Sequence, residues 1–194
     1  LLRSLVLHGT HAALSAVRRD ERGRFDGLAA GLAYSAPART YYRDGYWTLQ
    51  LLLDVAPAIV HEQIELLAAG VQPDGEAPSG VIVSGPEMGQ AWEQLRTTVF
   101  GLDFIHQRRS DWWSDHFDSP LFFILTIGDY VRKTGDKEPM ERHWPLMRAI
   151  FRRYCGFVQD GLPVKPRHDR DWADNVYRGG HVAYDLGLWV GALE

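Results

Sequence analysis

The sequence has few of the features that mark several classes of protein. Its 194 residues include a single cysteine, Cys155, so no internal disulfide is possible and the redox compartment stays open. The formal net charge is −4, whereas binding to nucleic-acid phosphates favours a basic surface. No apolar run reaches the roughly 18 residues that a membrane span requires. We therefore expect neither nucleic acid nor membrane as a partner, and we expect Cys155 to be a small buried hydrophobic side chain.

Motifs for metals, nucleotides and repeats are also incomplete or missing. Segment 61–65, His-Glu-Gln-Ile-Glu, resembles a zinc-protease motif only superficially because the second histidine is missing. His8 and His11 lie one helical turn apart with no carboxylate beside them, which favours a surface or core role over metal binding. Segment 80–85 lacks the glycine spacing of a phosphate-binding loop. We therefore expect no metal and no cofactor.

The sequence does contain several apolar patterns at helical spacing. With 45% hydrophobic and 24% charged residues, the composition is typical of a globular chain with one sizeable core. The segments with this spacing are 1–19, 49–69, 121–131, 140–158 and 182 onward. Pro57 predicts a kink or a break in the second segment, and Pro145 predicts a kink in the fourth. The pattern as a whole predicts an all-α fold.

Loops rich in glycine, proline and aspartate separate these segments. Residues 73–75, Pro-Asp-Gly, are a strong turn signal, and residues 81–83, Val-Ile-Val, predict a short β-like piece. Both lie in a long loop over residues 70–86, for which we expect an ordered structure and no site. The chain begins at Leu1 without a methionine and stops inside the last apolar pattern, so we expect a piece of a longer protein.

Three junctions between a loop and a helix place acids beside aromatic residues. They are 41–48, Tyr-Tyr-Arg-Asp-Gly-Tyr-Trp-Thr; 111–120, Asp-Trp-Trp-Ser-Asp-His-Phe-Asp-Ser-Pro; and 170–175, Arg-Asp-Trp-Ala-Asp-Asn. Singly, each has a structural explanation as a helix cap beside a core aromatic residue. Asp44 would cap its helix with Arg43 as its ion pair, and Asp118 would be the N-cap of the next helix. Together they predict one shared pocket, because aromatic faces stack on sugar rings while carboxylates bind sugar hydroxyls.

In order and in rough spacing, four segments resemble the six-hairpin glycosidases. The likeness is to the amylo-α-1,6-glucosidase domain of glycogen-debranching enzymes and to glucoamylase-like and mannosyl-oligosaccharide-glucosidase-like relatives. The segments are 39–48, 118–124 with 134–136, 171–174, and 182–184 with 188–189. The resemblance implies part of an (α/α)6 barrel, with about five of twelve helices in one incomplete domain over residues 1–194. It also implies hydrolysis, with inversion, of an α-glucosidic bond in an oligosaccharide or polysaccharide.

The resemblance further implies roles for particular residues. Asp44 would be the general acid, and Arg43 would orient it or hold substrate hydroxyls. The other residues expected to contact the sugar are Tyr46, Trp47, Trp113, Asp118, Trp172 and Asp174. The general base would be a glutamate in a later hairpin, beyond Glu194. Tyr184 stands where debranching relatives often carry a glutamate, which leaves the substrate specificity open.

Two other functions remain open at this point. The first is a glycan-binding domain without catalysis, which would keep the aromatic surface but lack the base. The second is an α-helical scaffold in which tryptophans and aspartates only pack and cap, and this is disfavoured because no period of roughly 34–47 residues recurs. As an isolated part of a barrel, the chain is expected to lack turnover and to associate, either with the rest of the barrel or with itself.

Overall fold

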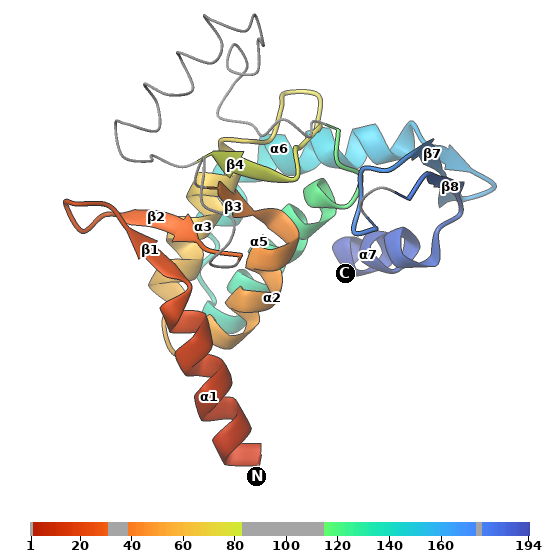
Figure 1. Ribbon diagram of the computed structural model, residues 1–194. Coiled ribbons are helices and arrows are strands. Elements are labelled where there is room, and N and C mark those ends of the chain that lie inside the picture. The colour runs from red at the N-terminus through yellow and green to blue at the C-terminus, as the bar shows by residue number, and fades with distance from the viewer. Residues whose placement is uncertain (1, 31–38, 83–114, 174–175) are drawn as a thin grey trace, which may run out of the picture.

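A computed structural model describes residues 2–30, 39–82, 115–173 and 176–194 (Figure 1). The helices of this part of the chain are α1 (Leu2–Ser15), α2 (Tyr42–Leu52), α3 (Pro57–Ala68), α5 (Ser119–Thr134), α6 (Glu138–Cys155) and α7 (Ala183–Leu193). Four two-stranded antiparallel sheets accompany them: β1 (Val17–Arg19) with β2 (Phe25–Leu28), β3 (Arg39–Tyr41) with β4 (Gly80–Ile82), β5 (Val158–Gln159) with β6 (Leu162–Pro163), and β7 (Lys165–His168) with β8 (Arg178–Gly180).

The expectation of an all-α fold, and with it that of an (α/α)6 barrel portion, is wrong. The described residues form a mixed α/β structure of six helices and four small sheets. The strands are two to four residues long. A polar–apolar alternation needs about four to eight residues to be recognised, so such strands leave no signal in the sequence. The only β-like piece that the sequence predicted, residues 81–83, overlaps β4.

Helix α5 lies at the centre of the helices and contacts α2, α3, α6 and α7 (Figure 1). Its apolar residues are buried nearly all round the helix, and Leu121, Phe122, Phe123 and Ile127 are fully buried. Pro120 stands in its first turn, and Gly135 closes it in the left-handed conformation, with φ of +74°. No helix in the described part of the chain is long and apolar enough to cross a membrane.

The helix boundaries confirm most of the predicted segments and correct others. The segment predicted over 49–69 is two helices, because α2 ends at Leu52 and Pro57 starts α3. Cys155 is exposed, contrary to expectation. It follows the buried Tyr154 on α6, and one residue rotates a helical side chain by about 100°. The N-terminal part of helix α1 projects beyond the other helices (Figure 1), so Leu5 and other apolar residues of its predicted core face are exposed.

The start of α2 is held by a small buried polar network. Strand β3 pairs with β4 and leads directly into α2. Gln63 of α3 donates from Nε2 to the hydroxyl of Thr40 at 2.7 Å, and both side chains are fully buried. The hydroxyl of Tyr42 donates to the carbonyl of Leu67 at 2.7 Å. These bonds fix the first turn of α2 against α3, and they leave the next residue, Arg43, to point toward α5.

Gly75 allows the turn at residues 73–75 to pack directly against α6. Its φ is +87°, and a Cβ atom there would lie 2.5–2.6 Å from backbone atoms of Ala149 and Ile150. We predict that Gly75→Ala lowers the unfolding free energy by about 2–4 kcal/mol, through backbone strain together with overpacking.

Gly135→Ala is the matched control for this variant. Gly135 has a similar φ of +74°, but a Cβ atom there would meet nothing within 4 Å. Gly135→Ala should therefore lower the unfolding free energy only by the strain of the left-handed backbone, about 1 kcal/mol. Urea denaturation of both variants measures the difference, and equal losses would contradict the packing argument.

Candidate functional site

Asp118 is the point where three of the sequence motifs meet. Its carboxylate accepts hydrogen bonds from Arg43 of α2 at 3.1 Å and from the Tyr184 hydroxyl of α7 at 3.0 Å, both on Oδ2. The Nδ1 atom of His116 lies 2.7 Å from Oδ1. Asp118 is fully buried, so its carboxylate depends on these partners in place of solvent. One carboxylate thus joins the starts of α2, α5 and α7.

The charge of Asp118 is stabilised in spite of its burial. Burial by itself would raise the pKa of this carboxyl, but the hydrogen bond and charge of His116, with Arg43 and Tyr184, outweigh it and lower the pKa. The effects on Arg43 are reversed: burial would lower the pKa of its guanidinium, but the charge of Asp118 raises it. The pKa of Tyr184 is raised by burial and by the neighbouring Asp118 charge, which keeps its hydroxyl protonated as a donor. The group is an ionised carboxylate inside a set of fixed donors.

A second buried acid, Asp171, holds the β7–β8 hairpin together. Its carboxylate lies 3.3 Å from Lys165 Nζ and 2.9 Å from Arg178 Nη2, and it accepts the backbone N–H of Ala173 at 2.8 Å. Burial would raise the pKa of Asp171, but the hydrogen bond from Arg178, with Ala173 and Lys165, lowers it. Lys165 is itself buried, and its ammonium also donates to the backbone carbonyls of His168 and Arg178.

Trp172 connects this hairpin to the group around Asp118. Its ring lies 4.7 Å from the guanidinium carbon of Arg178, a cation–π contact. The same ring packs against Tyr184 with the centroids 5.7 Å apart. Trp172 of the third junction therefore contacts Tyr184, which in turn binds Asp118 of the second junction.

Asp185 is a third buried acid, with a different environment. Among the residues that the structure describes, neither of its carboxyl oxygens has a hydrogen-bond partner. Its pKa is raised to about 7, by burial and by the charges of Asp118 and Asp171, against the opposite effects of Arg178 and Lys165. Asp185 therefore carries a proton over much of the range in which Asp118 is ionised, and it is the only one of these three acids placed to hold one.

The residues expected at the site lie in different environments. Asp44 is exposed in the first turn of α2, where Tyr41 and not Asp44 is the N-cap residue. Arg43 points inward to Asp118. Tyr46 is partly buried and packs against Phe122 with the ring centroids 5.2 Å apart. Trp47, on the same turn, is largely exposed. Trp113 and Asp174 lie outside the described residues.

The cap role expected for Asp118 is only half fulfilled. Asp118 does occupy the N-cap position of α5, and its carbonyl accepts the N–H groups of Leu121 and Phe122. Its side chain makes no cap hydrogen bond. The carboxylate is instead used entirely by Arg43 and its other two partners, and complete burial prevents it from touching a substrate. The local pattern predicts a side-chain cap, but the side chain of Asp118 is directed toward partners that are distant in sequence.

Several residues of this group were not expected from the sequence. His116 and Asp171 stand inside the quoted clusters, so an acid or imidazole beside an aromatic was a usable signal for them. Asp185 follows Tyr184 at a helix start, as Asp44 follows Arg43, and the same signal applies. Lys165 has no such pattern around it, and only the pairing of β7 with β8 brings it to Asp171.

Comparisons of the chain with protein-family models, with curated proteins and with solved structures find no match. The likeness to six-hairpin glycosidases therefore depends on the quoted motifs. A candidate set of metal ligands in the described residues lies on α3 and α6 and includes none of the residues around Asp118.

The pKa of Asp185 predicts a pH-dependent effect of its substitution. Because the folded pKa of about 7 exceeds the ordinary 3.8, the unfolded chain loses this proton first, and the buried acid costs stability increasingly as pH rises toward 7. Asp185→Asn removes that cost. We expect the unfolding free energy of the variant, relative to that of the unsubstituted chain, to rise by about 2–3 kcal/mol from pH 5 to pH 8. Denaturant titrations at both pH values test this, and an identical difference at each would show that Asp185 does not titrate in this range.

Proposed function

We propose that this chain carries a glycoside-hydrolase type of site that acts, with inversion, on α-glucosidic bonds of oligosaccharides or polysaccharides. The observation that supports the proposal is the group formed by Arg43, Asp118 and Tyr184. These residues come from three separate motifs, and they meet on one carboxylate. If the motifs served only as helix caps, their side chains would have no reason to meet.

Exposed tryptophans beside this group favour a carbohydrate as the ligand. Trp47 is 60% exposed one turn after Arg43, and Trp172 is 49% exposed beside Tyr184. Large aromatic faces left in solvent beside buried charges are suited to the C–H faces of sugar rings. The proposal depends on these residues and on no particular fold, since one chemistry occurs on many folds.

Asp44 is the acid that we assign to proton transfer. It is exposed, and it follows Arg43, whose guanidinium is fixed by the buried Asp118. In the proposed reaction Asp44 protonates the leaving glycosidic oxygen, while a second carboxylate activates a water on the opposite face of the sugar. Asp118 holds Arg43 in place and does not exchange a proton.

In a protein that carries both this chain and the second carboxylate, we predict that Asp44→Asn lowers the turnover of α-1,4- and α-1,6-linked gluco-oligosaccharides by about 10²–10⁴-fold. Substrate affinity and the thermal midpoint should stay close to those of the unsubstituted chain, because the side chain is exposed and Asn keeps its size. Release of glucose measures turnover, and isothermal titration calorimetry measures binding of the same sugars.

Asp54→Asn is the matched control, since Asp54 is another exposed acid, in the turn that follows α2. It should leave turnover and binding unchanged. Unchanged turnover in Asp44→Asn would contradict the assignment of the acid, and a large loss in Asp185→Asn would transfer that role to Asp185. In the protein that carries both carboxylates, binding of the sugars without any turnover would identify a glycan-binding domain, and absence of binding would contradict the carbohydrate proposal as a whole.

A further inference from the structure

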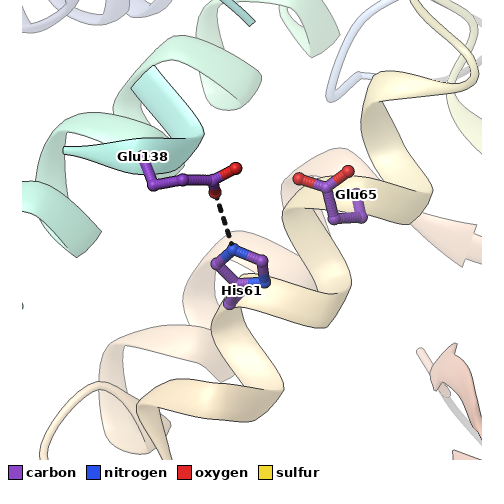
Figure 2. A group of neighbouring side chains, drawn as sticks. All are labelled: His61, Glu65 and Glu138. Atoms are coloured by element: carbon purple, nitrogen blue, oxygen red, sulfur yellow. Dashed lines mark hydrogen bonds and ion pairs between the residues drawn. The ribbon is translucent and has the colours of Figure 1, made fainter. Parts of the chain in front are cut away.

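A cluster of metal-binding side chain types lies between α3 and α6 (Figure 2). His61 and Glu65 are one turn apart on α3, and Glu138 stands in the first turn of α6. One ligand atom from each of the three lies within 4.8 Å of the other two. The Nε2 atom of His61 is 3.1 Å from a carboxylate oxygen of Glu138. Residues 77 positions apart in the sequence thus converge on one point.

These three ligands match the preferences of a zinc-like cation. Imidazole nitrogen and carboxylate oxygen are both zinc ligands, and three protein ligands leave a fourth position for water. Ligand atoms bound at 2.0–2.2 Å in a tetrahedron are about 3.4 Å apart, so the side chains need to close only slightly. They are 30%, 33% and 43% exposed for His61, Glu65 and Glu138, which gives them room to move and an ion a path from solvent.

Neighbouring residues hold two of the ligands in place. The Nε2 atom of His143, which is mostly buried, lies 2.9 Å from Glu65 and orients its carboxylate. The ring of Tyr130 packs against His61 with the centroids 5.9 Å apart. Hydrogen bonds from a histidine to a ligand carboxylate, and packing against a ligand ring, are typical outer supports of metal sites.

Arg142 occupies the position of a competing cation. Its guanidinium lies 3.3 Å from Glu65 and also pairs with Glu138, so it bridges the two acids. The side chain is 53% exposed and can swing into solvent. An exposed ion pair contributes little to stability, so a divalent ion bound directly by both carboxylates can displace it.

We propose that His61, Glu65 and Glu138 bind a zinc-like divalent cation, which links α3 to α6. In the bound form His61 turns the Nε2 lone pair to the metal, and its ring proton is on Nδ1. Arg142 moves outward as the metal enters. This site is independent of the proposed carbohydrate function.

The test is titration of the whole chain, stripped of metal with a chelator, with zinc chloride in a calorimeter and with cobalt(II) in an absorption spectrometer. We expect saturable binding of one ion, a rise of the thermal midpoint with zinc, and a tetrahedral cobalt spectrum. His61→Ala and Glu138→Gln should each weaken binding by at least about tenfold. Glu62→Gln changes the same charge on α3 next to His61 but outside the cluster, and it should leave the affinity unchanged.

Arg142→Gln separates a metal site from an ion-pair network. Removal of the competing guanidinium should strengthen zinc binding if the site is real. A network that serves only to join the helices predicts no zinc binding in either form, and this result would overturn the proposal. Binding that is lost in a His8→Ala/His11→Ala double variant and kept in His61→Ala would also overturn it, because the ion would then lie on α1. Circular dichroism of each variant confirms that it is folded, and the wild-type titrations remain decisive if one is not.

Discussion

The carboxylate of Asp118 is the constraint on which the arrangement of the helices depends. A buried ionised acid is costly unless donors surround it, and here they come from α2, from the loop before α5 and from α7. Loss of any one donor would leave part of a buried charge uncompensated. The three helix starts are therefore held together by an electrostatic requirement as well as by apolar packing around Phe122.

The buried acids at and near Asp118 lie in two opposite electrostatic environments. Asp118 and Asp171 each have cationic and hydrogen-bonding partners that lower their pKa values below the ordinary range. Burial raises the pKa of Asp185, and the charges of Asp118 and Asp171 raise it further, while no hydrogen-bond partner among the described residues offsets them. Neighbouring acids whose pKa values are shifted in opposite directions are common at functional sites, where one acid must hold a proton while another stays charged.

The charged side chains between α3 and α6 are more exposed than those around Asp118. The two acids, Glu65 and Glu138, are partly exposed, and each has partners that can be exchanged. Burial makes the partners of Asp118 permanent, whereas solvent access makes those of Glu65 and Glu138 replaceable. This difference is why the first group is suited to positioning other residues and the second to receiving an ion.

Much of the helical structure was predictable from the sequence because its causes are local. The apolar spacing in α5 and α6, the break at Pro57 and the turn at residues 73–75 all depend on residues a few positions apart. The junctions that combine acids with aromatics were recognisable for the same reason. Arg43 and Asp118 were selected from these junctions as candidate site residues, but their mutual contact was not predicted.

Only the tertiary structure decided which way the side chains of these junctions turn. The side chain of Asp118 binds Arg43 and makes no cap hydrogen bond, and Lys165 is buried against Asp171. In both cases a partner distant in sequence offsets the free-energy cost of burying the charge. The four short sheets and the meeting of His61 with Glu138 likewise result from pairing between segments that no local pattern connects. The sequence by itself therefore determined the helices and their junctions, which depend on local spacing. The mixed α/β fold and the composition of both sites depended on contacts across the fold.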